Sequence, residues 1–245
     1  MKRLAAFFLI LLLLTGCAAE LPYDRYHAAE MKTAALETVD CNYRFAVEVQ
    51  AAALSRIVET EGHLILDNTG EQPQFMLETR NNGAFTTIHG KDGILYYTSD
   101  DLIGQTTAGD DQNDALTRAW KPLSFAAEDF VNAELLNEDG QKVLYAMVAA
   151  DRAAELMLEP IGEKIGMDLS AFTCNDLSVH ATFTPDGYLA STELLLSMTA
   201  QFDGIDGIVY VVFEQTYNDP GSAVSPGFPS ALETYPALTS GESAE

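Results

Sequence analysis

The sequence of 245 residues predicts an α+β protein built on one antiparallel β-sheet, and three patterns support this fold class. Apolar and polar residues alternate with a period of two from Cys41 to Ala53, which is typical of a strand with one buried face. Turn sequences such as NNG (81–83) and KDG (91–93) separate strand-like runs at intervals of about ten residues. Helical spacing is confined to a few segments, so the short connections favour hairpins over βαβ units.

One helix and a series of hairpins make up the first half of the predicted domain. Tyr23–Val39 carries apolar residues at helical spacing and predicts the helix. After the run that begins at Cys41, glycine-containing turns bound four further strand-like runs: Arg56–Leu66, Gln74–Arg80, Ala84–His89 and Ile94–Thr98. The pattern then changes, because polar caps and Pro122 within Asp110–Phe130 favour one or two short helices.

Strand patterns return in the second half. Val131–Asn137 and Lys142–Ala149 flank the turn sequence NEDG, and a helix is predicted from Asp151, with Pro160 expected to kink or end it. Three longer strands follow: Leu177–Thr184, Tyr188–Met198 and Ile208–Tyr217. Their apolar runs, LLL and IVYVVF, predict central strands that are covered on both faces.

The amino-terminal segment is typical of an export signal. Lys2 and Arg3 precede an apolar run that ends at Leu14, which is shorter than the roughly 20 residues needed to cross a bilayer. The next residues, LTGC, resemble the lipobox of bacterial lipoproteins. The resemblance implies that 1–16 is a signal peptide, that Cys17 carries a diacylglycerol anchor, and that 17–25 forms the anchor and a short linker. Two acyl chains give stable attachment, so we expect the protein outside the cytoplasm, on the cell membrane or on an outer membrane where the host has one.

With Cys17 lipidated, two cysteines remain, Cys41 and Cys174. An even number of cysteines in an exported chain is consistent with a disulfide between them. Two unpaired buried thiols explain the sequence equally well, because a disulfide requires a geometry that spacing alone does not reveal.

The chain divides into one domain and a tail. Residues 26–217 contain all the periodic segments and predict a single domain, whereas 218–245 is acidic, rich in proline, serine and glycine, and predicted to be disordered. The 13 basic and 37 acidic residues give a net charge of −24, which disfavours nucleic acid as a partner.

No motif in the sequence predicts catalysis, and no metal or cofactor site is expected. GxSxG, HExxH, Walker A, GxGxxG and CxxC patterns are absent, and the four histidines lie in unrelated segments. Trp120, the single tryptophan, is interpreted as a core or lid residue.

Two stretches of the mature chain, GEQPQFMLETRNNGAFTTIHGKDGILYYTSD and FTPDGYLASTELLLSMT, together with the order of elements, are similar to the LolA/LppX-like lipoprotein superfamily and its uncharacterised Gram-positive relatives. The resemblance covers roughly residues 26–217. It implies a curved antiparallel half-barrel with helices over its concave face, which encloses an apolar cavity for lipid or acyl chains.

The resulting hypothesis is a non-catalytic, membrane-anchored protein that binds a lipid or another hydrophobic ligand. Candidate lining residues are the inward sets of two strands: Phe45, Val47, Val49, Leu194, Leu196 and Met198. The alternative for these residues is a filled core. The alternative function is a structural or interaction module of the cell envelope that has no small-molecule ligand.

Overall fold

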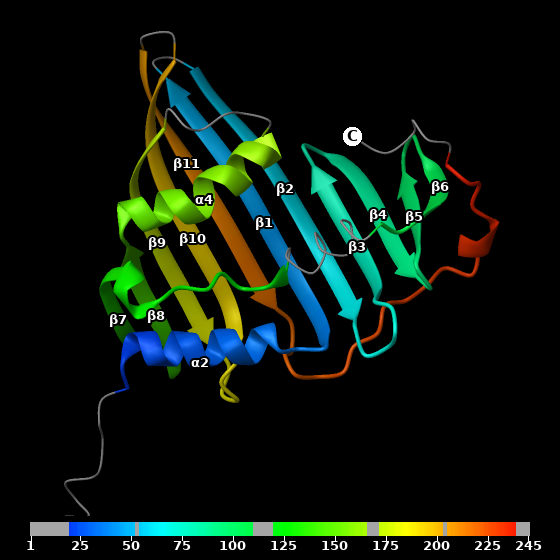
Figure 1. Ribbon diagram of the computed structural model, residues 1–245, viewed down its shortest axis with the longest axis horizontal. Coiled ribbons are helices and arrows are strands. Elements are labelled where there is room, and N and C mark those ends of the chain that lie inside the picture. The colour runs from blue at the N-terminus through cyan, green and yellow to red at the C-terminus, as the bar shows by residue number, and fades with distance from the viewer. Residues whose placement is uncertain (1–19, 52–53, 110–119, 166–171, 203–204, 239–245) are drawn as a thin grey trace, which may run out of the picture.

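The computed structural model describes residues 20–51, 54–109, 120–165, 172–202 and 205–238, so Cys17 lies outside the described residues. One open, curved sheet of eleven antiparallel strands forms the frame of the molecule (Figure 1). The strand order is β6-β5-β4-β3-β2-β1-β11-β10-β9-β8-β7. The first and last strands of the chain therefore pair in the middle and join two meanders, and the predicted α+β class with an antiparallel sheet is confirmed.

Ten of the eleven strands correspond to the predicted runs in their order along the chain, and one, Ile103–Thr107, was not predicted. They are β1 (Thr38–Ala51), β2 (Leu54–Asp67), β3 (Gln74–Asn81), β4 (Ala84–Lys91), β5 (Ile94–Ser99), β6 (Ile103–Thr107), β7 (Phe130–Glu138), β8 (Gln141–Val148), β9 (Thr173–Phe183), β10 (Leu189–Phe202) and β11 (Ile205–Tyr217). Three hairpins turn on two residues with positive φ, 82–83, 92–93 and 139–140. This geometry needs asparagine, aspartate or glycine, which explains why the predicted turns hold.

Two helices lie among the described residues, α2 (Pro22–Ala34) and α4 (Ala150–Ile165), with 3₁₀ turns at Ala127–Asp129 and Leu232–Thr234. The first helix is shorter than predicted because strand pairing already begins at Thr38. The second continues past Pro160, at which the sequence predicts that the helix kinks or ends. Its buried residues Met157 and Ile161 lie on either side of the proline, and their packing compensates for the lost hydrogen bond.

Of the one or two short helices predicted between Asp110 and Phe130, the described residues show a helical Trp120 and one 3₁₀ turn. Residues 121–126 are irregular and lead into the single 3₁₀ turn at 127–129, and residues 110–119 lie outside the described part. Here the polar caps predicted helices, but the buried Trp120 and Phe125 use the segment to pack against the sheet.

We call the sheet face that carries the hydrophobic core the inner face. Both helices and the segment 120–126 pack against it, through residues such as Tyr26 of α2, Phe125 and Met157 of α4. Figure 1 shows these pieces crossing the half of the sheet formed by β7–β11 and β1. The opposite side is the outer face, where Leu195, Ile208 and Tyr210 are exposed. The prediction that the central strands are covered on both faces is therefore wrong.

The predicted disorder of residues 218–245 is wrong for 218–238. This segment runs from the end of β11 to the edge of the sheet formed by β5 and β6 (Figure 1). Leu232 is buried there, and the Tyr235 hydroxyl lies 2.9 Å from the Thr98 hydroxyl. It ends beside β6, where the Gln105 amide donates to Pro236 O at 2.8 Å and the Leu238 amide donates to Gln105 O at 2.9 Å. We call 218–238 the strap.

Candidate functional site

The two candidate sets from the sequence come together on the inner face. Strand register places them in three rungs across β1, β11 and β10, which are Phe45–Phe213–Leu194, Val47–Val211–Leu196 and Val49–Val209–Met198. All six candidates are buried or half-buried. Because a period of two alternates faces, each strand alone supplies one column, and the pairing of three strands makes a continuous apolar surface.

Three separate pieces of chain cover this surface. The described residues of α4 contribute Ala153, Met157 and Ile161, α2 contributes Tyr26 and Ala29, and the segment between the helices contributes Trp120 and Phe125. All belong to one core cluster with the three rungs. The surface is therefore an apolar layer between a sheet and a helical cover.

A polar corner adjoins the apolar rungs. The next rung contains Tyr43, Gln215 and Thr192, and the Gln215 side chain is only 1% exposed. The Tyr217 hydroxyl donates to Trp120 O at 2.8 Å and lies 3.3 Å from Gln215 Oε1. The Trp120 Nε1–H is buried and has no hydrogen-bond partner among the described residues. A buried donor without a partner is rare in folded proteins, so Trp120, whose carbonyl oxygen lies at this corner, has an unused capacity to bind an acceptor.

Burial determines the protonation state of the phenols near this corner. It raises the pKa of Tyr217 and of Tyr26 well above the usual range, and it also raises the pKa of Tyr43. All three hydroxyls therefore remain protonated at neutral pH and serve as hydrogen-bond donors.

The two described cysteines lie far apart and are both free and buried. Strand pairing places Cys174 opposite Met198, Met198 opposite Val209, and Val209 opposite Val49. Val49 lies eight residues along β1 from Cys41. This offset corresponds to about 27 Å, whereas a disulfide requires Cα atoms within roughly 7 Å. The structure thus contains two thiols and not the disulfide. Burial raises the pKa of Cys41 to about 12, so this thiol is not a nucleophile at neutral pH.

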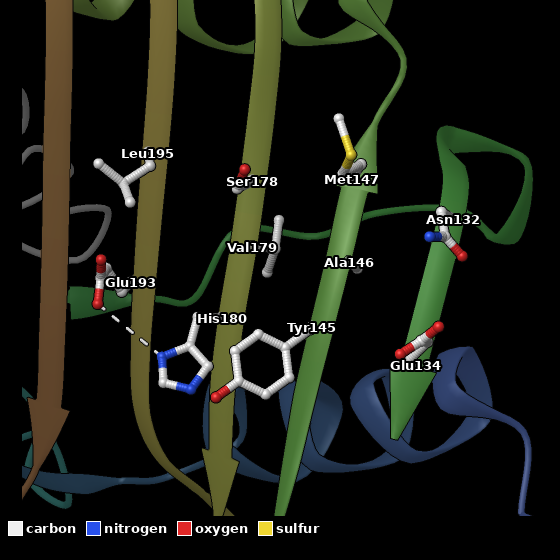
Figure 2. A pocket seen from close by; sticks show the side chains of 10 residues that line it. All are labelled: Asn132, Glu134, Tyr145, Ala146, Met147, Ser178, Val179, His180, Glu193 and Leu195. Atoms are coloured by element: carbon white, nitrogen blue, oxygen red, sulfur yellow. Dashed lines mark ion pairs between the residues drawn. The ribbon is translucent and has the colours of Figure 1, made fainter. Parts of the chain in front are cut away.

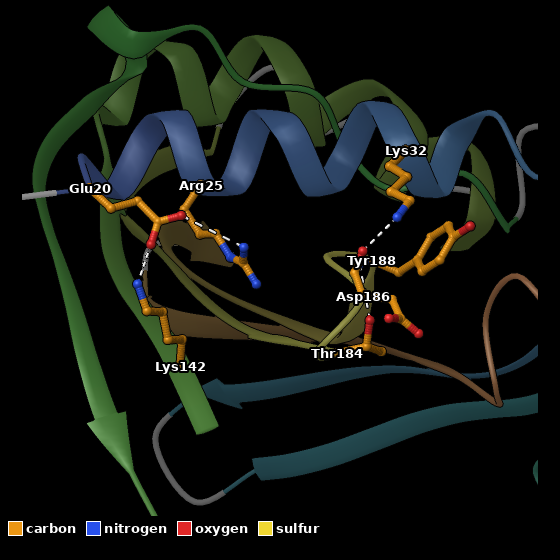
Figure 3. A network of polar contacts seen from close by, with 7 residues as sticks. All are labelled: Glu20, Arg25, Lys32, Lys142, Thr184, Asp186 and Tyr188. Carbon is orange, nitrogen blue, oxygen red and sulfur yellow. Dashed lines mark hydrogen bonds and ion pairs between the residues drawn. The ribbon is translucent and has the colours of Figure 1, made fainter. Parts of the chain in front are cut away.

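Helix α2 is held at both ends by polar contacts (Figure 3). At its start, Glu20 forms ion pairs with Lys142 of β8 and with Arg25, whose guanidinium also lies 4.8 Å from the ring of Phe183. At its end, Lys32 donates to Asp186 O in the β9–β10 turn and lies 4.1 Å from the ring of Tyr188. Partly exposed ion pairs contribute about 0–1 kcal/mol each. The contacts at the two ends of α2 are therefore weak compared with the packing of the sheet.

Two hydrogen bonds, one buried and one partly buried, connect α2 to the rest of the inner layer. The Thr33 Oγ1 accepts from the Leu189 amide at 2.9 Å, and the Tyr26 hydroxyl donates to Leu123 O at 2.8 Å. The bond to Leu189 links α2 to β10 and must break if the helix moves away from the sheet, whereas the bond to Leu123 links α2 to the segment 120–126.

The described part of the chain shows neither a metal-binding cluster nor a helix that could span a membrane. No group of three or more histidine, cysteine, aspartate or glutamate side chains is placed to hold a metal ion there. None of the helices within those ranges combines the length and apolar character needed to cross a bilayer.

Sequence reasoning missed the polar corner. Trp120 was assigned to a core or a lid, and it does lie in the core at 4% exposure, but nothing local linked it to Tyr217, 97 residues away. The available signal was the polar Gln215 in the inward column of β11, which carries Val209, Val211 and Phe213.

The fold and the site define an α+β protein with an apolar layer between one open antiparallel sheet and two helices. No family model and no curated protein matches the sequence. Among solved structures, the chain is similar to a DUF1329 family protein from Desulfovibrio piger, with 11% identity, coverage of 83% of this chain and 96% of that chain, and a TM-score of 0.25. It is also similar to a LolA superfamily protein from Nitrosomonas europaea, with 8% identity, coverage of 82% and 95%, and a TM-score of 0.24.

A third similar structure is a putative outer membrane lipoprotein-sorting protein domain from Vibrio parahaemolyticus, with 12% identity, coverage of 74% and 84%, and a TM-score of 0.18. TM-scores this low do not establish a shared fold, and they assign no function to this chain.

Proposed function

We propose that the protein is an extracytoplasmic lipoprotein, anchored through Cys17, that binds a lipid or another apolar ligand between the inner face of its curved sheet and the helices. Its role is binding and not catalysis. One observation carries the proposal: three apolar rungs end at a polar corner that includes the Trp120 carbonyl, and the buried Trp120 Nε1–H has no partner among the described residues. The LTGC motif supports the anchor.

The chemistry of this layer suits an acyl chain with a carbonyl at one end. Each methylene transferred from water to the apolar layer contributes about 0.8 kcal/mol. A carbonyl oxygen at the polar corner would accept from Trp120 Nε1, whose unmet hydrogen bond costs about 1–3 kcal/mol. Entry requires part of the cover to move, and opening at α2 would break its weak end contacts and the buried Thr33–Leu189 hydrogen bond.

The single tryptophan provides a direct test, since Trp120 lies within the proposed site. Full-length protein in phosphatidylcholine vesicles is titrated with a long-chain fatty acid brominated near its carboxyl end, and tryptophan emission is recorded. Because bromine quenches indole emission only at short range, saturable quenching is expected. An unbrominated fatty acid should compete and restore the emission.

A matched control moves the reporter to the other face. In a Trp120→Phe, Tyr210→Trp variant, the indole replaces a half-exposed ring on the outer face, and the same titration should leave its emission nearly unchanged. Equal quenching of both reporters would show nonspecific partitioning of the fatty acid. Absence of quenching at Trp120 would overturn the proposal.

A further inference from the structure

A groove of about 460 Å³ crosses β7–β10 on the outer face, on the side of the sheet opposite the helices (Figure 2). The rings of Tyr145 and His180 stack at its floor, with centroids 4.7 Å apart and an interplanar angle of 25°. Met147 and Leu195 lie beside this aromatic pair. The groove shares no side chain with the three inner rungs, so its function is independent of the proposed ligand site.

Two apolar side chains that line the groove are exposed side by side. Met147 is 42% exposed and Leu195 is 41% exposed, and both flank Ser178 in one rung of the sheet. The neighbouring strand adds the exposed Tyr210. Scattered exposed apolar residues are ordinary, but a group that lines a groove is typical of a surface that binds a partner.

The charge of the groove is negative and is not neutralised by lysine or arginine. Glu134 and Glu193 line it, and none of the residues that line it is a lysine or an arginine. Within the described ranges, Glu193 forms an ion pair with His180 alone, with Oε2 and Nδ1 3.8 Å apart, and Glu134 forms none. On the same face, by contrast, Arg44 lies between Glu59 and Glu214, at 2.6 and 3.0 Å.

Access to the groove is open from one side. It reaches Asn132 and Glu134 on β7, the last strand at that edge of the sheet. The other edge strand, β6, is flanked by the end of the strap, which contributes a parallel bridge between Gln105 and Ala237. A partner can therefore approach across β7 without displacing a described segment of the chain.

We infer that this groove docks a positively charged amphipathic segment of a partner protein. Lysine or arginine side chains of the segment would lie over Glu134 and Glu193, and its apolar side chains would pack on Met147, Leu195 and the Tyr145 ring. Charge complementarity selects this occupant. A second copy of the chain is disfavoured, because it would bring the same carboxylates and another net charge of −24 against the groove.

The test measures binding of a synthetic peptide to the full-length protein in phosphatidylcholine vesicles, with empty vesicles as the blank. The probe is a twelve-residue peptide of alternating lysine and leucine. Two comparison peptides replace lysine by glutamate or leucine by serine. Only the lysine–leucine peptide should bind with saturation, and its affinity should fall as salt rises. Carbodiimide cross-linking followed by mass spectrometry should join its lysines to Glu134 or Glu193.

Matched variants separate the groove from the rest of the outer face. Glu193→Gln and Leu195→Ser should each weaken binding about fivefold, as expected for the loss of one partly exposed ionic or apolar contact. Glu48→Gln and Ile57→Ser change the same residue types on the same face outside the groove, and they should leave the affinity unchanged. Thermal melting of each variant verifies that it is folded.

Three outcomes would overturn the inference. Equal affinity of the groove variants and the native chain would place binding elsewhere. Equal binding of all three peptides would show a nonspecific surface. Binding to empty vesicles, without cross-links to Glu134 or Glu193, would show that the peptide binds the membrane. Each result is independent of the Trp120 titration, so the two proposals fail separately.

Discussion

The two described thiols differ enough in burial to be distinguished chemically. Cys41 is fully buried with a pKa of about 12, so roughly one thiol in 10⁴ is ionised at pH 8. Cys174 is 8% exposed, and burial raises its pKa as well. We predict that iodoacetamide leaves both thiols nearly unmodified in the native protein, that Cys174 reacts first, and that both react after unfolding without reductant. Mass spectrometry of the intact chain measures the modification.

The control for this prediction is the same unfolding after reduction, which should add no further alkylation. A chain that gains alkylation at Cys41 and Cys174 only after reduction would contain the disulfide that the strand register separates. Either result also shows whether a fluorophore can be attached to an introduced cysteine without labelling Cys41 or Cys174.

At the residue scale, the sequence predicted which face each side chain occupies but not its neighbours. The period of two placed Val47 and Leu196 among inward residues, because alternation is a local property of a strand. Their meeting in one rung depends on the pairing of β1 with β11, the first and last strands of the chain. No local pattern encodes that pairing. The same limit explains why Tyr217 was not linked to Trp120.

At the element scale, the strap tests whether a proline-rich tail contributes to stability. Truncation after Gly221 removes Leu232 and Tyr235 and exposes the outer side of β4 and β5. Burial of Leu232 alone is worth about 1.5–3 kcal/mol, equivalent to a decrease in Tm of roughly 3–12 °C for a chain of this size. We predict a decrease of at least this size, measured by circular dichroism during heating.

If the chain truncated after Gly221 melts like the native chain, the contacts of the strap contribute no stability. A Leu232→Ala variant should show part of the effect of the truncation without shortening the chain.

The predicted boundaries of elements are wrong where local composition favours one structure and tertiary packing favours another. Proline, serine and acidic residues in 218–245 predicted disorder, because such segments rarely bury enough apolar area. Yet Phe228, Leu232 and Tyr235 are spaced so that each reaches the sheet, with Phe228 6.1 Å from the ring of His89. Likewise, Pro160 signals the end of a helix, but α4 packs on both sides of it. Tertiary contacts overrode local propensity in both segments.

At the scale of the whole molecule, a short tether would orient the domain on the membrane. Only Ala18 and Ala19 separate Cys17 from Glu20, so a lipid on Cys17 would hold Glu20 within about 10 Å of the bilayer surface. Glu20 is paired with Lys142 at the start of β8, which places α2 and the β9–β10 turn at the membrane end. The far end of the sheet lies about 40 Å away, because twelve residues of β2 separate Asp67 from Ser55.

We predict that this orientation is measurable by energy transfer from the protein to acceptor lipids at the vesicle surface. A fluorophore on Asp186→Cys, in the β9–β10 turn, should transfer strongly, and one on Ser55→Cys should transfer weakly. Cys17→Ser should release the chain and abolish both signals. Equal transfer from the two positions would mean that the domain tumbles freely on its tether. Stronger transfer from position 186 than from position 55 would place α2, which covers the apolar layer, next to the bilayer that would supply the ligand.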